Sequence, residues 1–235
     1  MCTRFVYNGN DTVVGFNFDI DLAEYEHKVI TEKDKFLIGI RMPDGQYHSF
    51  HGINANGNIG TLLYVHGNER AFRNKDDSCC TVAELTENFV SGKLSFEQAV
   101  QIVKQKEIIY EKDATMQSFL SDENGQVLII EPGIGYRTEK KKYSLMTNYS
   151  ILEPQSTQSY ITPGDERYEL AKEMLCGFNE YFSTVDAFSV LEKVKQEGLW
   201  ATRVSFVFSV KLRTVYYVEN NHFDKIKEWK PSKIL

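Results

Sequence analysis

The sequence has no long apolar run, no excess of basic charge and little that suggests export. Its longest apolar stretches, at 127–130 and 206–210, fall far short of the ~20 residues that span a bilayer, so no membrane is expected as a partner. Asn8, Asn10 and Asp11 interrupt the first apolar segment, which argues against a signal peptide. The formal net charge of −6 argues against nucleic acid as a partner, because phosphate binding needs a basic face. We therefore expect a cytoplasmic protein.

Cysteine and histidine are also sparse and lack metal-binding spacing. The five histidines form no paired motif and the four cysteines contain no C-x-x-C, so we expect neither a metal site nor a cofactor. Without an export segment, the thiols are expected to be free and not paired in disulfides. Cys79 and Cys80 precede a predicted helix and fit either a buried or an exposed position. Cys176 falls in an apolar helix pattern and is expected to be buried.

A chain of 235 residues with 42% apolar and 26% charged residues has the composition of an ordinary globular protein. No linker, repeat or low-complexity segment interrupts it, so we expect a single domain over residues 1–235. Short apolar or alternating segments predict strands, and turn signals such as Asn8-Gly9 and Asn56-Gly57 separate them. The predicted strands are 3–7, 12–18, 36–41, 46–53, 59–65, 118–121, 126–131, 143–147, 202–210 and 213–218.

Four predicted helices interrupt these strands in two pairs. Thr81 is the expected N-cap of a helix that ends near Gly92, and Ser95 with Gln98 forms a capping box for the next helix. The second pair spans about 165–176 and 184–196, and Gly198 is the expected stop of the latter helix. The order sheet, helices, sheet, helices, sheet predicts an α+β fold with two antiparallel sheets between helical layers.

The cysteine at position 2 is the residue with the clearest chemical potential. Met1 precedes a small side chain, the situation in which the initiator methionine is usually removed. Cys2 would then carry a thiol and a free α-amino group, whose unperturbed pKa of about 7.7–8.0 suits a base near neutral pH. Such a residue can act as a nucleophile without a histidine. A second-position cysteine without any function is the alternative.

Several motifs accompany Cys2, in order along nearly the whole chain. They are Met1-Cys2-Thr3, Gly15-Phe16-Asn17-Phe18-Asp19, Gly52-Ile53-Asn54-Ala55-Asn56-Gly57, Leu145-Met146-Thr147-Asn148, Pro163-Gly164-Asp165 with Arg167-Tyr168, Ala201-Thr202-Arg203-Val204-Ser205, and Tyr216-Tyr217. Together they resemble the choloylglycine hydrolases, a family of N-terminal-nucleophile amidases that includes penicillin V acylases and bile salt hydrolases. The resemblance implies a four-layer αββα sandwich and hydrolysis of a linear amide C–N bond.

The resemblance also implies roles for five residues. Cys2 would be the nucleophile and its own amine the general base, while Asp19 would orient and charge-balance that amine. Asn148 would donate its side-chain amide to the oxyanion of the tetrahedral intermediate, with Asn68 as a second contributor. Arg167 would lie close to Cys2 and Asp19, as a fixed cation that lowers the thiol pKa.

Structural roles fit some of these residues as well. Asn148 fits an ordinary strand end, and Arg167 fits a helix surface beside Glu166 and Glu169. Three phenylalanines and a tyrosine fit either the lining of an acyl pocket or the core, and the core is the better prediction for them: Tyr64, Phe16, Phe18 and Phe119.

The sequence departs from the family pattern in two ways. Phe16 stands where the family has an arginine, so Arg4 or Arg167 would have to supply that cation. The chain is also shorter than typical members, between Asn68 and Thr81 and between Asn148 and Arg167, which argues against a wide bile-salt pocket and a four-subunit assembly.

Three functions are compatible with these observations. The first is hydrolysis of a small N-acyl amide, such as a phenoxyacyl amide, an N-acyl amino acid or an acyl lactone, through a thioester on Cys2. The second is a catalytically inactive relative that binds or regulates, which the change at Phe16 would favour. The third is acyl transfer to an amine. Assembly into a homo-oligomer is left open.

Overall fold

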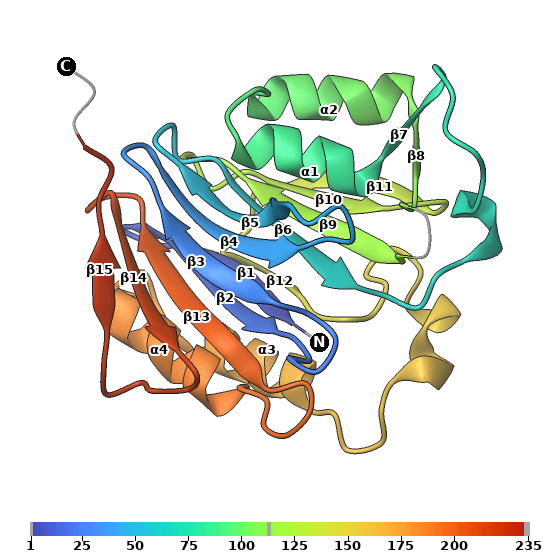
Figure 1. Ribbon diagram of the computed structural model, residues 1–235. Helices are drawn as coiled ribbons and strands as arrows, with labels where there is room; N and C mark the ends of the chain where they lie inside the picture. Colours follow the sequence, from blue (N-terminus) through green and yellow to red (C-terminus); the bar gives the residue numbers. More distant parts are fainter. Residues whose placement is uncertain (1, 112–113, 233–235) are drawn as a thin grey trace.

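Two stacked β-sheets, with a pair of helices on each outer face, make up the fold (Figure 1). The computed structural model describes residues 2–111 and 114–232. Within these residues, no helix has the length and apolar character needed to cross a membrane. The α+β sandwich predicted from the sequence is confirmed.

The first sheet, sheet A, holds the start of the chain. In the described residues it has six strands, each antiparallel to its neighbours. Their order is β12 (Tyr143–Met146), β1 (Thr3–Asn8), β2 (Thr12–Asp19), β13 (Thr202–Ser209), β14 (Thr214–Glu219) and β15 (Lys227–Trp229). Because β1 lies between β2 and β12 and is antiparallel to both, its first residue lies beside their last residues.

The second sheet, sheet B, stacks on sheet A. The described chain gives it seven antiparallel strands. Their order is β11 (Gly135–Glu139), β10 (Val127–Glu131), β9 (Met116–Ser121), β6 (Ile59–Tyr64), β5 (Tyr47–Asn54), β4 (Lys35–Arg41) and β3 (His27–Thr31). A short parallel pair, β7 (Cys79–Thr81) and β8 (Glu107–Ile109), lies apart from both sheets.

Helices cover the outer face of each sheet (Figure 1). Sheet B is covered by α1 (Val82–Val90) and α2 (Phe96–Gln105), and sheet A by α3 (Arg167–Gly177) and α4 (Thr184–Lys193). The predicted N-caps are confirmed, since the Thr81 side chain accepts from Glu84 N and Ser95 with Gln98 forms a complete capping box. Three short 3₁₀ turns lie in loops: η1 (Glu69–Ala71), η2 (Pro154–Ser156) and η3 (Gln158–Tyr160).

The core has three apolar layers, one between the sheets and one under each pair of helices. Successive side chains of β1 point to opposite faces of sheet A and so belong to two of these apolar layers. Phe5 and Tyr7 pack under α3 and α4, whereas Val6 packs between the sheets. Cys2 belongs to the same inter-sheet layer as Val6. The side chain of Cys2 therefore faces sheet B and not the helices.

Some local predictions were wrong or incomplete. Cys176 is exposed, because the buried face of α3 carries Ala171 and Leu175, and Cys176 lies about 100° around the helix from Leu175. The last helix ends at Lys193 and not near Gly198, because Gln196 exchanges hydrogen bonds with Thr202 at the start of β13. The four cysteines are free, as expected.

The sequence also gave no sign of five short strands, namely β3, β7, β8, β11 and β15. Three of these strands, β3, β11 and β15, lie at the edges of their sheets and are largely exposed or half-buried. Edge strands carry charged residues and do not show a clean apolar alternation. The other two strands are only three residues long.

Candidate active site

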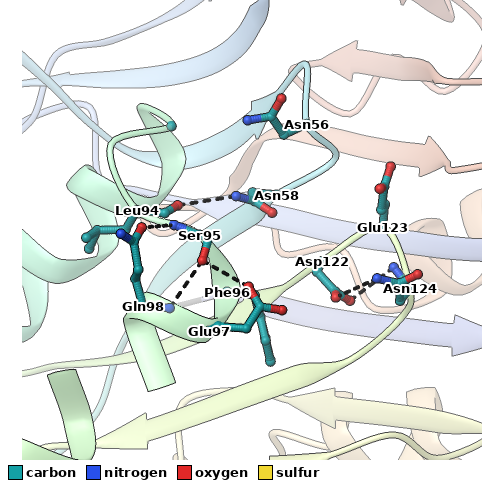
Figure 2. A pocket seen from close by; sticks show the side chains of 11 residues that line it. Asn56, Asn58, Leu94, Ser95, Phe96, Glu97, Gln98, Asp122, Glu123 and Asn124 are labelled. Carbon is teal, nitrogen blue, oxygen red and sulfur yellow. Dashed lines mark hydrogen bonds between the residues drawn. The ribbon is translucent and has the colours of Figure 1, made fainter. Parts of the chain in front are cut away.

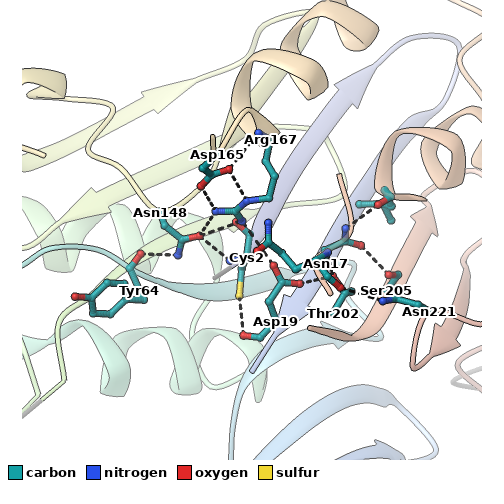
Figure 3. A network of polar contacts seen from close by, with 12 residues as sticks. Cys2, Asn17, Asp19, Tyr64, Asn148, Asp165, Arg167, Thr202, Ser205 and Asn221 are labelled. Carbon is teal, nitrogen blue, oxygen red and sulfur yellow. Dashed lines mark hydrogen bonds and ion pairs between the residues drawn. The ribbon is translucent and has the colours of Figure 1, made fainter. Parts of the chain in front are cut away.

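Four of the five predicted site residues meet at one end of sheet A (Figure 3). Cys2 immediately precedes β1, and Asp19 is the last residue of β2. Asn148 follows the end of β12 by two residues, and Arg167 is the first residue of α3. The strand order brings the first three chain positions together, and α3 adds the arginine from the helical layer.

Cys2 is buried, with 6% of its surface exposed. Its backbone N–H donates to Asn148 Oδ1 at 2.7 Å, and its Sγ lies 3.9 Å from the carbonyl oxygen of Asp19. Burial raises the pKa of the thiol to about 11, although the N-terminal amino group and, less strongly, Arg167 act in the opposite direction. The expected lowering by Arg167 is therefore present but is outweighed by burial. The thiol is neutral at rest.

Asp19 is held by residues of two other elements. Its Oδ1 accepts a hydrogen bond from the Thr202 hydroxyl at 2.6 Å, and Thr202 lies directly opposite Asp19 in the register of β2 and β13. Its Oδ2 lies 3.6 Å from Nη1 of Arg167. Burial raises the pKa of the Asp19 carboxyl to about 7, because it outweighs the opposing effects of the N-terminal amino group, Thr202 and Arg167.

Arg167 contacts Cys2, Asn148 and Asp19, as well as Asp165. Its Nε and Nη2 donate to the two carboxylate oxygens of Asp165, at 2.9 and 2.7 Å. Its Nη1 donates to the carbonyl oxygen of Cys2 at 3.1 Å and to Asn148 Oδ1 at 3.3 Å. Burial disfavours the charged form, but the contacts with Asp165 and Asp19 prevail and raise its pKa. Arg167 is thus a permanent buried cation, not a surface residue of its helix.

The Asn148 side chain links the two sheets. Its Oδ1 faces Cys2 and Arg167, and its Nδ2 donates to the carbonyl oxygen of Tyr64, at the end of β6, at 2.7 Å. Gln117, fully buried on β9, donates to the carbonyl oxygens of Thr147 and Tyr149 at 2.8 and 3.1 Å. Gln117 therefore fixes the backbone on both sides of Asn148.

A buried carboxylate anchors the segment that follows Asn148. Glu131, the last residue of β10, accepts hydrogen bonds from the Ser150 hydroxyl and from the backbone N–H groups of Ile151 and Leu152. Burial raises its pKa, although these donors oppose the shift. The loop that carries Asn148 is consequently tied to sheet B at two places.

Asn68, the fifth predicted residue, lies in a different setting. Its Nδ2 donates to the carbonyl oxygen of Pro132 at 2.7 Å and to the Tyr110 hydroxyl at 3.1 Å, and its backbone N–H also donates to Tyr110. Within the described part of the chain, these partners do not belong to the Cys2 cluster. Its contribution to an oxyanion hole stays a prediction.

Arg4, one of the two residues expected to supply the cation that Phe16 lacks, directs its guanidinium group away from the Cys2 cluster. Phe16 is fully buried and packs on His51 and Phe206. Arg4 lies opposite Phe16, but its Nη2 donates to Ser121 Oγ, and Ser121 ends β9 at the end away from the Tyr64 carbonyl. Arg167 is the arginine that contacts Cys2.

The aromatic residues weighed as pocket lining divide into two groups. Phe16, Phe18 and Phe119 are buried core residues, as predicted, whereas the core prediction for Tyr64 is wrong, because this last residue of β6 is half-exposed. Tyr64 is therefore the one of the four that reaches solvent beside the Cys2 cluster.

A surface hollow of about 340 Å³ lies at the opposite end of β6 and β9 (Figure 2). Its lining includes Asn58, which precedes β6, and Asp122, which follows β9. The polar groups of this hollow serve local structure, because Ser95 and Gln98 cap α2 and Asp122 accepts from the turn at Asn124. In residues 2–111 and 114–232, no three His, Cys, Asp or Glu side chains are grouped to hold a metal ion.

No family model matches the chain, and no curated protein matches it. Solved structures do. Penicillin V acylase from Agrobacterium tumefaciens superposes with a TM-score of 0.66 at 17% identity, covering 93% of this chain and 83% of that chain. A mutant conjugated bile acid hydrolase from Clostridium perfringens gives a TM-score of 0.68 at 14% identity, covering 98% and 92%. The Caenorhabditis elegans ortholog of N-acylethanolamine-hydrolyzing acid amidase gives 0.61 at 14% identity, covering 97% and 99%.

The chain has the fold of an N-terminal-nucleophile hydrolase. The fold implied by the sequence motifs is thereby confirmed. At 14–17% identity the similarity concerns the fold, and the chemistry has to be argued from the residues around Cys2.

Sequence reasoning missed three residues that hold this site, namely Asp165, Thr202 and Gln117. Asp165 and Thr202 stand inside motifs that carried the resemblance, but the motifs gave them no role. Gln117 has no signal in the sequence, because a polar residue near the start of a strand is ordinary until its burial is known.

Proposed function

We propose that this protein hydrolyses a linear amide bond of a small N-acyl substrate, with Cys2 as the nucleophile after removal of Met1. The observation that carries the proposal is the meeting of Cys2 with Asp19, Asn148 and Arg167 at one end of sheet A. Solved proteins with this fold are named as a penicillin V acylase, a conjugated bile acid hydrolase and an acid amidase, which supports the same class of reaction here.

Removal of Met1 would turn the Cys2 amide nitrogen into a primary amine. That nitrogen lies 2.7 Å from Asn148 Oδ1, so the amine would already be oriented by a hydrogen bond. An α-amine with a pKa of about 7.7–8.0 is partly unprotonated near neutral pH and can take a proton. The nucleophile would then need no separate base.

The proposed reaction proceeds through a thioester. Sγ of Cys2 forms a bond to the acyl carbonyl carbon while its proton passes to the α-amine. The C–N bond of the tetrahedral intermediate breaks, and the departing amine takes that proton. Water then attacks the thioester, the acid leaves, and the thiol is restored. Because burial raises the thiol pKa to about 11 in the chain that keeps Met1, the proposed step couples deprotonation to the attack.

Asn148 is the proposed donor to the oxyanion. Its amide nitrogen carries two hydrogens, and the Tyr64 carbonyl accepts one of them in the described conformation. The second would serve the oxyanion, a contribution typically worth a few kcal/mol, about 3 to 4. Asn68 is the proposed second contributor, a role for which its amide has to turn away from Pro132.

Amine release from a panel of N-acyl compounds tests the proposal. The panel contains phenoxyacetyl amides, N-acyl amino acids and N-acyl lactones, and products are measured by mass spectrometry. We expect turnover of at least one class, and its loss in Cys2→Ala, which retains a small residue after Met1. Cys80→Ala is the matched control, because Cys80 is a half-buried thiol outside the site. Equal turnover in Cys2→Ala would remove the proposed nucleophile.

A further inference from the structure

Asp165 lies beside the guanidinium group of Arg167 in the Cys2 cluster (Figure 3). It lies two residues before Arg167, in the turn that leads into α3, and its side chain is 3% exposed. Its Oδ1 accepts from the backbone N–H of Arg167 at 3.2 Å and from Nε at 2.9 Å, and its Oδ2 accepts from Nη2 at 2.7 Å. Such a two-point contact between arginine and a carboxylate fixes the plane of the guanidinium group.

Because the plane of the guanidinium group is fixed, the position of its remaining nitrogen, Nη1, is fixed as well. Nη1, which makes none of these contacts with Asp165, lies 3.1 Å from the Cys2 carbonyl oxygen, 3.3 Å from Asn148 Oδ1 and 3.6 Å from Asp19 Oδ2. A long arginine side chain has many rotamers, and without an anchor it would sample positions away from these three groups. Asp165 therefore controls the geometry of Arg167 without touching Cys2.

Asp165 also balances the charge of the cluster. The titratable side chains that face one another here are the Cys2 thiol just before β1, Asp19 from β2, Tyr149 after β12, and Asp165 with Arg167 from the entry to α3. The N-terminal amino group also lowers the pKa of both Cys2 and Asp19. The carboxylate of Asp165 offsets the positive charge of Arg167. If it were neutral, Arg167 would favour the ionised forms of both Asp19 and Cys2 more strongly.

We propose that Asp165 is a positioning residue of the site, which locks Arg167 against Cys2 and Asn148 and balances its charge. The proposal rests on the proposed amide hydrolysis for its catalytic meaning. The proposed effect of Asp165 on the Cys2 thiol does not depend on amide hydrolysis and can be measured separately.

The pH dependence of Cys2 alkylation measures that effect directly. Iodoacetamide is added over a range of pH to the folded full-length chain, and the labelled N-terminal peptide is quantified by mass spectrometry. In Asp165→Asn the uncompensated Arg167 is expected to move the alkylation midpoint down by about one pH unit. Glu166→Gln removes the same charge from the exposed neighbour, which makes no side-chain cap bond, and is expected to leave the midpoint unchanged. An unchanged midpoint in Asp165→Asn would overturn the charge-balancing role.

A second variant separates position from charge. Asp165→Glu keeps the carboxylate but lengthens the side chain by one methylene, so the two-point contact is disturbed. Because Arg167 then lies less closely against Cys2 and favours the thiolate less, we expect the alkylation midpoint to rise above the wild-type value, opposite to Asp165→Asn, while amide turnover falls at least tenfold. Full turnover in Asp165→Glu would overturn the positioning role, and this variant decides alone if Asp165→Asn fails to fold.

Turnover of the wild-type chain distinguishes the two proposals. If the wild-type protein hydrolyses no amide but Asp165→Asn moves the Cys2 midpoint, the proposed function fails and the role of Asp165 in the cluster stands. If the wild type is active and Asp165→Asn changes neither the alkylation midpoint nor the acidic limb of the pH–rate profile, the proposed role of Asp165 fails and the proposed amide hydrolysis stands.

Discussion

Two buried arginines face the same protein interior in opposite electrostatic settings. Arg167 contacts the carboxylates of Asp165 and Asp19 and the oxygens around Cys2. Arg4 is fully buried between the sheets, and its described contacts are neutral: the Phe5 carbonyl, the Ser121 hydroxyl and the ring of Phe119, 5.0 Å away.

The difference shows in the direction of the two pKa values. Burial alone lowers the pKa of Arg4 to about 9, whereas carboxylate contacts raise that of Arg167. Among residues 2–111 and 114–232, Arg4 thus carries the desolvation penalty of a buried charge without an opposite charge to offset it. The arginine built into a charge-balanced network is the one that serves the candidate site, and the isolated one belongs to the core.

Replacement of Arg167 is expected to have the largest effect. Arg167→Leu leaves two carboxylates, Asp19 and Asp165, buried without their cation, and removal of one partner of a buried ion pair typically costs about 3–5 kcal/mol. Urea unfolding measures this loss, and amide turnover is expected to fall below detection. A stable and active Arg167→Leu variant would contradict the claim that Arg167, unlike Arg4, is needed for the candidate site.

The pH dependence of stability tests the buried carboxyl beside Arg167. The pKa of Asp19 is raised to about 7, above the unfolded value of about 3.9, so the folded state binds its proton more tightly. Its contribution to stability is complete below pH 4 and is lost as the pH rises through 7.

In Asp19→Asn this pH-dependent loss of stability should be absent. Between pH 4 and 7 the free energy of unfolding of the wild type should therefore fall by on the order of 3 kcal/mol relative to that of the variant. Urea unfolding at several pH values measures the difference. The pKa of about 7 already includes the lowering by the N-terminal amino group. Parallel stability curves for the two chains would contradict the raised pKa.

Gln117 supports Asn148 through neutral hydrogen bonds, whereas Arg167 contacts Asn148 with a charged group. Gln117→Leu removes the donors to the Thr147 and Tyr149 carbonyls, and each unsatisfied buried acceptor typically costs about 1–3 kcal/mol. Because Asn148 lies between these carbonyls, turnover should fall by at least tenfold while the alkylation midpoint of Cys2 stays unchanged. A shifted midpoint would mean that Gln117 affects the charge network as well.

Arg4→Met is expected to have the smallest effect, and of opposite sign. Methionine fills a similar volume without a buried charge, so stability should stay equal or rise by about 1 kcal/mol, and turnover should be kept. Urea unfolding beside Arg167→Leu gives the direct contrast. A loss of several kcal/mol in Arg4→Met would show that Arg4 has an anionic partner in solution.

The layers of the fold could be predicted from the sequence because its buried strands are strongly apolar and its turns carry glycine. Capping by Thr81 and Ser95 was readable for the same reason, since a cap depends on residues three positions apart. Edge strands such as β3 and β11 could not be predicted, because their half-exposed faces carry no apolar alternation. The exposure of Cys176 required knowledge of which helix face meets the sheet.

Four members of the candidate site were predictable from the sequence, but their contacts and the residues that support them were not. Cys2, Asp19, Asn148 and Arg167 stand out by motif, and antiparallel pairing brings the first three together. The two-point contact of Asp165 and the burial that raises the Cys2 pKa depend on side-chain packing, which a motif does not encode.

Intact mass and peptide mapping after incubation with a slowly hydrolysed N-acyl amide test the central claim most directly. We expect a chain that has lost Met1 and carries the acyl group on Cys2, at a level that falls as product accumulates. A chain that keeps Met1 and leaves Cys2 unlabelled, while Cys79 or Cys80 reacts, would contradict an N-terminal nucleophile.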